Sequence, residues 1–213
     1  MKKASNPGAE AQERELRKIY EKVLDPEHPD TLRVRSNLAW VLDDEGKYAE
    51  AEAEDRQVLK LKEKALGPEH PDTLGTRGNL ANVFDHQGKY AEAEAQDREV
   101  LKLKEKVLGP EHPDTLSNRS NLANALEHQG KHSQAEPDFR DVIKRQEKVL
   151  GPEHPDTLRS CYYFASALER QSRFEEAKEF ARRAAEGARK VLGPDHPSTH
   201  KYEELLVDLE AKR

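Results

Sequence analysis

Histidine side chains are the first candidates for chemistry in this 213-residue sequence, because a neutral imidazole can bind zinc or move protons near neutral pH. Five of the nine histidines precede a proline, and they recur every 42 residues, at positions 28, 70, 112, 154 and 196. A shared zinc ion needs ligands within about 2.1 Å. If each 42-residue unit is a pair of packed helices, equivalent histidines in successive units lie about 10 Å apart. We therefore interpret these histidines as turn residues that precede helices.

Other residues that could support catalysis lack the neighbours that catalysis needs. His196 and His200 stand four residues apart and supply only two of the ligands that a zinc site requires. Cys161, the single cysteine, forms no internal disulfide and has no glycine-rich turn beside it that would activate a thiolate. No glycine-rich phosphate-binding loop occurs either. The sequence thus predicts a protein that is not an enzyme and that holds no metal or cofactor.

Polar and aromatic residues in a repeated order are better candidates for binding a partner. Asn37, Asn79 and Asn121 occupy equivalent positions 42 residues apart. An amide can donate to and accept from a peptide group without reading its side chain, and tryptophan, tyrosine and arginine are frequent interface anchors. The expected partner-binding groove therefore also includes Arg33, Trp40, Asn82, Asn124, Arg159, Tyr162 and Tyr163. The alternative is that the asparagines are inert remnants of a recent duplication.

A unit that repeats along the chain must position these residues. The segment His-Pro-Asp-Thr-Leu occurs four times, and a degenerate fifth copy begins at residue 196. Residues 25–66 and 67–108 are identical at roughly three quarters of their positions, as one supersecondary unit copied in register would be. The same period places two further units at 109–150 and 151–192. We expect the array of units itself to be the fold.

Each unit has the pattern of two helices joined by a tight turn. In the second unit, residues 71–87 carry apolar side chains at helical spacing, and Pro71 suits the first position of a helix. A short interruption at 88–89 precedes a second helix at 90–108, which a Gly-Pro pair then ends. Two helices joined by so short a turn are antiparallel neighbours.

The composition indicates how such hairpins must pack. Charged residues make up 37% of the chain and hydrophobic residues only 34%, a balance too polar for an ordinary globule of this size. Small residues at fixed places let helices approach closely, so that little apolar surface suffices. These residues are Ala39, Ala81, Ala123 and Ala165 in the first helices and Ala51, Ala93, Ala135 and Ala177 in the second. The predicted fold is all-α, a right-handed α-solenoid of antiparallel helix hairpins.

The period also predicts the two ends of the array. Residues 7–24 match the second helix of a preceding unit, with Asn6 as its cap and Pro7 in its first turn. Residues 193–213 match the first helix of a fifth unit and would cap the array. We therefore expect residues 1–213 to form one solenoid with four complete hairpins and a single helix at either end. These terminal helices could support self-association.

The motifs resemble the 42-residue tetratricopeptide (TPR) repeats of kinesin light chain and of nephrocystin-like proteins. The residues that carry the resemblance are Asn79-Leu80-Ala81, Gln87-Gly88-Lys89-Tyr90, Ala93-Glu94 and the run from Glu105 to Pro113. The resemblance covers essentially the whole chain, although only the repeat module is present. It implies a TPR-like superhelix whose first helices line a concave, partner-binding groove, and it implies protein binding without catalysis.

Two departures from those repeats lead to structural expectations. Arg35 and Arg77 occupy a position that is apolar in kinesin light chain repeats, and Asp55 and Asp97 occupy one that is usually a buried aromatic residue. Because both exchanges occur in the same units, we expect an Arg–Asp ion pair inside each hairpin; the alternative is that each charge reaches solvent. In the fourth unit, Gly187 is expected to loosen the second helix by about 1 kcal/mol relative to alanine.

Charge and hydropathy limit the class of partner. The formal net charge is −6 with both signs mixed along the chain, so nucleic acid is not an expected partner. No run approaches the roughly 20 apolar residues of a membrane span, and the N-terminus has no signal-peptide pattern. We therefore predict a cytoplasmic scaffold that binds an extended peptide or partner segment in the groove. The alternative is a regulatory or sensor segment of a larger signalling ATPase.

Overall fold

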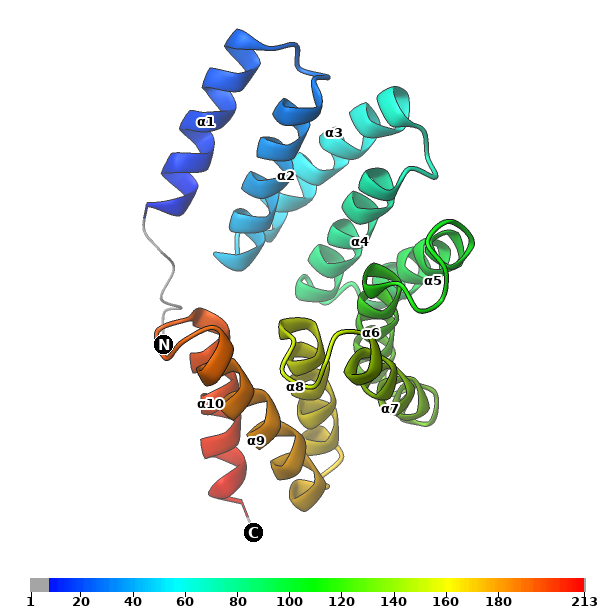
Figure 1. The fold of residues 1–213 in the computed structure, drawn as a ribbon, viewed down its shortest axis with the longest axis vertical. Coiled ribbons are helices and arrows are strands. Elements are labelled where there is room, and N and C mark those ends of the chain that lie inside the picture. The colour runs from blue at the N-terminus through cyan, green and yellow to red at the C-terminus, as the bar shows by residue number, and fades with distance from the viewer. Residues whose placement is uncertain (1–7, 213) are drawn as a thin grey trace. The chain divides into compact units, whose positions relative to one another are not determined.

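The computed structural model describes residues 8–212, which form ten α-helices joined by short turns (Figure 1). These described residues contain no β-strand, so the predicted all-α fold is confirmed. We call the helices that begin at the proline of a His-Pro pair the A helices and the others the B helices. The A helices are α2 Pro29–Asp44, α4 Pro71–His86, α6 Pro113–His128, α8 Pro155–Arg170 and α10 Pro197–Glu210, and the B helices are α1 Ala9–Val23, α3 Tyr48–Leu66, α5 Tyr90–Val107, α7 His132–Val149 and α9 Phe174–Val191.

The helices group into two compact units, Met1–Leu108 and Gly109–Arg213, which we call unit 1 and unit 2. In unit 1, α2 packs against α3 and α4 packs against α5, while α1 packs on α2 and α3 packs on α4. In unit 2, α6 packs against α7 and α8 packs against α9, while α7 packs on α8 and α10 packs on α9. Within each unit, helices therefore pack mainly against their neighbours in sequence, as stacked hairpins do.

The two end helices are shorter than the ranges expected from the sequence. α1 begins at Ala9 after Gly8, and the expected cap residues Asn6 and Pro7 lie outside the described residues. α10 ends at Glu210. In the part of the chain that the structure describes, no helix has the length and apolar character to cross a membrane.

Small side chains fill the contacts between helices. All eight alanines singled out from the sequence are buried. Close approach of the helix backbones at these methyl groups explains how a chain with so few apolar residues forms a core. Larger apolar residues, such as Leu38, Leu80, Phe139 and Phe164, fill the remaining space.

The histidine of each His-Pro pair has a structural role that the sequence did not reveal. His28, His70, His112, His154 and His196 are the N-caps of the five A helices. In each, Nδ1 accepts a hydrogen bond of 3.1 to 3.2 Å from the backbone N–H two residues later. The N–H would otherwise lack a partner at the start of the helix. A neutral imidazole therefore performs the capping that serine or aspartate performs elsewhere.

Removing one of these caps should destabilise the chain. We expect His70→Ala to lower the free energy of unfolding by about 1 kcal/mol, whereas His70→Asn, which keeps a capping acceptor, should change it by only a few tenths. Urea unfolding followed by circular dichroism measures both changes. His200→Ala is the control, because His200 lies exposed within α10 and caps nothing. Equal effects of the two alanine substitutions would contradict the capping role.

The expectation that Gly187 loosens α9 did not include the close packing at this residue. A Cβ atom built on Gly187 would lie 2.4 Å from Cδ2 and 2.9 Å from Cδ1 of Leu158, which is buried in α8. Such distances are far below van der Waals contact. Gly187 therefore lets α8 and α9 approach each other, and the cost of glycine in the helix accompanies close packing.

The expected Arg–Asp pairs were also wrong. Arg35 donates to Glu54 at 2.6 Å and to Gln57 at 2.7 Å, both on α3, and it does not pair with Asp55. The side chain of Asp55 is buried, and its Oδ1 has no hydrogen-bond partner among the described residues. Burial raises the pKa of Asp55 to about 8. The arginine thus reaches the acceptors at either side of the aspartate, while the aspartate points into the core.

The second hairpin repeats this pattern with different acceptors. Arg77 donates to Glu99 of α5 at 2.8 Å and to Glu63 of α3 at 2.6 Å, and not to Asp97. Each arginine reaches the B-helix residue 22 positions later, which is Gln57 for Arg35 and Glu99 for Arg77. The arginine therefore links an A helix to B helices at the edge of the hairpin.

Candidate functional site

The side chains predicted to bind a partner lie on the A helices of each unit. In unit 1, Arg33, Asn37 and Trp40 of α2 are exposed, and Asn79 and Asn82 of α4 are half-buried. The Trp40 side chain is 63% exposed, although tryptophan is highly buried on average. Spacings of three and four residues put each set on one face of its helix, and α2 contacts α4. We call this surface the A face of unit 1.

On α4, the A face of unit 1 has two glycines and therefore few projecting side chains. Gly75 and Gly78 stand where α2 has Arg33 and Ser36. A Cβ atom on Gly75 would meet nothing within 4 Å, so no packing contact requires this glycine. The backbone of a partner can therefore approach α4 closely at Gly75, the position equivalent to Arg33.

In unit 2, the predicted residues lie on α6 and α8 but are less exposed. Asn124 is buried, and Asn121 is half-buried. On α8, Arg159, Tyr162 and Tyr163 are all half-buried. Unit 2 thus offers less accessible polar surface at these positions than unit 1.

Tyr162 serves mainly as a packing residue. Its ring stacks on Tyr202 of α10 with 4.6 Å between the ring centroids, and Nζ of Lys201 lies 4.9 Å from the centre of its ring. Burial raises the pKa of Tyr162. Sequence reasoning missed Tyr202 and Lys201, because α10 departs from the repeat pattern. Tyr163, whose ring centroid is 5.9 Å from that of Tyr162, is the second aromatic residue at this place.

The two arginines that were predicted to line the groove are paired within their own helices. Arg33 lies 3.3 Å from Asp30, and Arg159 lies 3.0 Å from Asp156. Each pair spans three residues, a spacing that joins neighbours on a helix surface. The positive charge that these arginines offer to an acidic partner is therefore partly compensated.

The cysteine and histidine residues considered for catalysis take part in packing or in helix capping. Cys161 is buried, and burial raises the pKa of its thiol to about 11, which disfavours the thiolate. His196 uses Nδ1 to cap α10, so this atom is occupied. Among the described residues, no three histidine, cysteine, aspartate or glutamate side chains are grouped to hold a metal ion.

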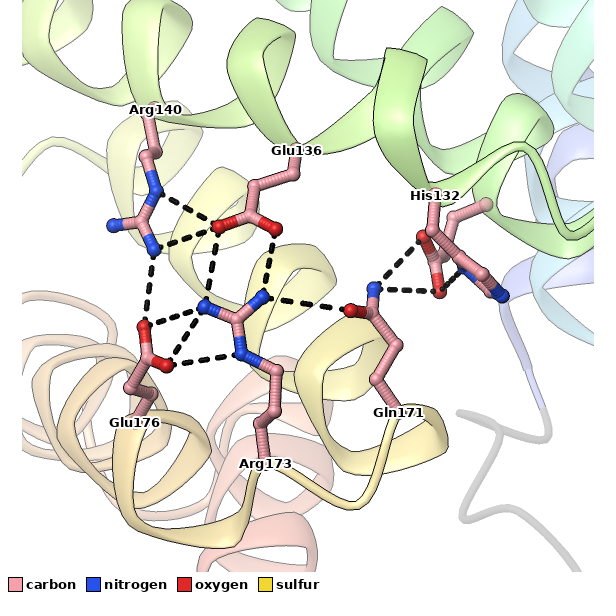
Figure 2. Close-up of polar contacts among 7 residues, drawn as sticks. His132, Glu136, Arg140, Gln171, Arg173 and Glu176 are labelled. Carbon is pink, nitrogen blue, oxygen red and sulfur yellow. Dashed lines mark hydrogen bonds and ion pairs between the residues drawn. The ribbon is translucent and has the colours of Figure 1, made fainter.

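An ion-pair network joins the B helices of unit 2, as Figure 2 shows. Glu136 of α7 accepts from Arg173 at 2.6 Å and from Arg140 at 2.9 Å. Glu176 of α9 accepts from the same two arginines at 2.7 and 3.0 Å. Arg173, followed by Arg140, holds the pKa of Glu136 below its usual range. Because the four charges compensate one another, the network stabilises the packing of two hairpins and leaves no free charge.

A buried acid lies beside this network. Glu127 of α6 accepts from Nε2 of Gln171 at 3.3 Å, and Nδ1 of His132 lies 2.8 Å from its carboxylate. Gln171 in turn accepts from Arg173 at 3.5 Å (Figure 2). Since its carboxylate is hydrogen-bonded on both sides, Glu127 extends the structural network and does not provide a free catalytic base.

Unit 1 contains the same arrangement. Glu52 of α3 accepts from Gln87 at 2.9 Å, from Arg56 at 2.9 Å and from Lys89 at 3.1 Å. The bond from Gln87 is the largest cause that lowers the pKa of Glu52 to about 2. The equivalent Glu10 of α1 also has its pKa lowered to about 2, by hydrogen bonds from two cations. Repeated ladders of this kind hold successive hairpins in register.

A shallow depression in unit 1 lies between two of the turns that join A and B helices. Nδ1 of His86 is 2.8 Å from Asp43, and its ring centroid is 5.5 Å from that of Tyr48. The depression is lined by His86 and Tyr48 and also by Lys47, Glu52, Gln87 and Lys89. These polar side chains already bond to other residues of unit 1. We assign the depression to the packing of successive hairpins and not to a ligand site.

Comparison with known proteins identifies the repeat. The family profile described as "Tetratricopeptide repeat" matches four overlapping segments, residues 9–64, 44–106, 76–148 and 114–190. No curated protein sequence matches the chain.

Several solved structures are similar to this chain. The nearly identical TPR-like repeats of a kinesin light chain-like protein from Podosopora anserina are 29% identical, with a TM-score of 0.61, over 86% of this chain and 87% of that one. BtubC (BKLC) from P. vanneervenii is 18% identical with a TM-score of 0.66, over 99% and 82%. A Rap protein in complex with competence and sporulation factor is 16% identical with a TM-score of 0.57, over 95% and 58%. The last two likenesses concern the fold alone.

Proposed function

Because the chain belongs to the tetratricopeptide repeat family, whose repeats form protein-interaction scaffolds, we propose that it binds an extended peptide or partner segment along its A helices without catalysing a reaction. The observation that carries this proposal is the exposure of Trp40 on the same face as the amides of Asn37 and Asn79. A partner that covers an exposed tryptophan buries a large apolar area, and such residues often dominate binding energy.

The spacing of the asparagines suits an extended chain. Asn37 and Asn79 occupy equivalent positions on α2 and α4, and packed helices lie about 10 Å apart. An extended peptide advances about 3.3 Å per residue, so each amide would meet roughly every third peptide group. The bare helix surface at Gly75 gives the peptide backbone room to reach these amides. Trp40 would then hold an apolar side chain of the partner.

The asparagines should contribute to binding and not to folding. We expect the triple substitution Asn37→Ala, Asn79→Ala and Asn121→Ala to weaken binding of a peptide by about 1 kcal/mol or more, since peptide groups of the ligand would lose partners. Folding should be unchanged or slightly more stable, because alanine is the better helix former. Calorimetry with a peptide selected from a displayed library against the intact chain measures the affinity.

Two further variants make this test specific. Trp40→Ala should weaken binding of the same peptide. The control is Gln134→Ala, which removes an exposed amide from the B helix α7 and should leave the affinity unchanged. Unchanged affinity of the triple variant would show that the asparagines are inert. Binding lost in the Gln134 variant but kept in the Trp40 variant would place the site on the B helices.

Two other expectations remain predictions. Self-association would use the end helices, where Val23 of α1 is 72% exposed and Val207 of α10 is 64% exposed. The other expectation is a role as a regulatory segment of a larger signalling ATPase, and no feature of the described residues supports it in particular. The scaffold is therefore the function we retain.

A further inference from the structure

The B helices carry a row of basic residues that the net charge of the chain conceals. Positively charged residues follow one another at intervals of four, an interval that keeps them on one helix face. In unit 1 these residues are Arg14, Lys18 and Lys22 on α1, Arg56, Lys60 and Lys64 on α3, and Arg98, Lys102 and Lys106 on α5. All of them except the half-buried Arg14 are exposed.

Acidic residues compensate the first and last members of the row on α3. Glu52 bonds Arg56 at 2.9 Å, and Glu27 bonds Lys64 at 2.5 Å. The middle residue Lys60 has no acidic partner among the described residues.

The α5 helix follows the same rule. On α5, Glu94 bonds Arg98 at 2.9 Å and Glu69 bonds Lys106 at 2.7 Å, whereas the exposed Lys102 between them has no acidic partner in the described part of the chain. On α1 the pattern differs: the middle residue Lys18 forms an exposed ion pair of 3.5 Å with Glu15, and the last residue Lys22 has no acidic partner in the described part of the chain. We call Lys18, Lys60 and Lys102 the middle lysines. Within the residues that the structure describes, Lys60 and Lys102 are uncompensated, whereas Lys18 has the exposed ion pair with Glu15.

The middle lysines occupy equivalent repeat positions on successive B helices of unit 1, and side chains of α1 reach α3. Arg14 of α1 bonds Glu50 of α3 at 2.6 Å, and Arg17 of α1 bonds Glu54 of α3 at 2.9 Å. In unit 2 the same position holds Lys144 on α7 but Glu186 on α9. The row of like charges thus continues on α7, as Arg140, Lys144 and Lys148, and is interrupted on α9 by Glu186.

The surroundings of the middle lysines define the chemistry of a ligand. The exposed alanines Ala53 and Ala95 lie two turns before Lys60 and Lys102, so the surface beside them is open. The described B helices of unit 1 expose no aromatic ring on which nucleic acid bases could stack. On α3 and α5, large apolar side chains are exposed only at the last residues of the helices, which gives a membrane little to insert.

We propose that the middle lysines of unit 1 form a docking surface for an acidic, extended polypeptide segment. Successive hairpins repeat at about 10 Å, and an extended strand advances about 3.3 Å per residue, so a carboxylate at every third residue would keep pace with the lysines. Charge complementarity of this kind favours fast association and depends on ionic strength. This surface lies on the B helices and does not depend on the proposed role of the A face.

Fluorescence anisotropy of a labelled peptide tests the proposal on the full chain. The probe is a 12-residue glycine–serine peptide with glutamate at every third position, titrated at low and at physiological salt. The variant carries Lys18→Gln, Lys60→Gln and Lys102→Gln, and exposed residues of this kind can be changed without loss of fold, which circular dichroism checks. We expect at least a tenfold loss of affinity in the variant and weaker binding of the unchanged chain at higher salt.

A matched control removes three positive charges elsewhere. Lys148→Gln, Lys190→Gln and Lys201→Gln lie in unit 2 and should change the affinity by less than threefold. Equal losses in the two triple variants would overturn the proposal, because only the total charge would then matter. Tighter binding of an oligothymidylate or of phosphatidylserine vesicles than of the peptide would overturn it as well, in favour of a nucleic acid or a membrane.

Discussion

Replacing Asp55 with asparagine should stabilise the chain by about 2 to 4 kcal/mol at pH 9 and by almost nothing near pH 4. Asp55 is 1% exposed and its Oδ1 lacks a hydrogen-bond partner among the described residues, so its charged form is costly. Burial is the largest cause that raises the pKa of this carboxyl from 3.8 to about 8. A pKa shift of this size corresponds to a cost on the order of 5 kcal/mol for the ionised carboxyl in the folded chain. The expected gain is smaller, because the asparagine amide that replaces it is also a buried polar group.

The direction of the pH dependence follows from the raised pKa of Asp55. Below pH 3.8 the carboxyl is protonated in the folded and unfolded chains alike, so its titration does not affect stability. Between pH 3.8 and about 8 the unfolded chain releases the proton while the folded chain retains it, and the free energy of unfolding falls as the pH rises. Above about pH 8 both states are ionised, and the loss is complete.

Urea unfolding of both proteins between pH 4 and 9 measures this difference. Subtracting the unchanged chain from the Asp55→Asn variant removes the contributions of groups common to both. Asp208→Asn, the same chemical change at an exposed position of α10, should shift stability by less than about 0.5 kcal/mol. A gain for Asp55→Asn that does not vary with pH, or a loss at pH 9, would show that the carboxylate is solvated or hydrogen-bonded.

The period of 42 residues predicted the helices closely. The expected helices at 71–87 and 90–108 are α4, Pro71–His86, and α5, Tyr90–Val107. Proline at the first helical position and glycine after the last one are strong local signals, so they place helix ends with little help from tertiary structure.

Side-chain partners were harder to predict, because they depend on which of several acceptors a long side chain reaches. The sequence paired Arg35 with Asp55, but the guanidinium bonds Glu54 and Gln57 on either side of it. Neighbouring residues on a helix point about 100° apart, so an error of one position exchanges Asp55, which lacks a partner at Oδ1 among the described residues, for Glu54, which accepts from Arg35. The capping role of His70 was missed for a related reason, since histidine is not among the usual N-cap residues.

For the candidate site, the sequence predicted which residue types lie on the A helices but not which of their side chains are accessible to solvent. Trp40 is open to solvent, whereas Tyr162 packs on Tyr202 of a helix that departs from the repeat. The middle lysines were overlooked because a net charge of −6 averages over ladders in which most acids already have partners. The uncompensated cations emerge only when each ion pair is assigned.

Two glycine-to-alanine substitutions should change stability in opposite directions. Gly187→Ala is expected to lower the free energy of unfolding by about 1 to 2 kcal/mol, because the cost of overpacking against Leu158 exceeds the gain in helix propensity. Gly75→Ala is expected to raise it by up to about 1 kcal/mol, since the new methyl group meets nothing within 4 Å. Both residues are helical, so each substitution serves as the control for the other.

A second change at Leu158 separates packing from other effects. Leu158→Ala alone should destabilise the chain by about 2 to 5 kcal/mol, because it leaves a cavity between α8 and α9. In the double variant with Gly187→Ala, the added methyl group fills part of that cavity, so the combined loss should be smaller than the sum of the two. Strict additivity would mean that Gly187 and Leu158 do not pack against each other, and a stabilising Gly187→Ala would restore the view that this glycine only loosens α9.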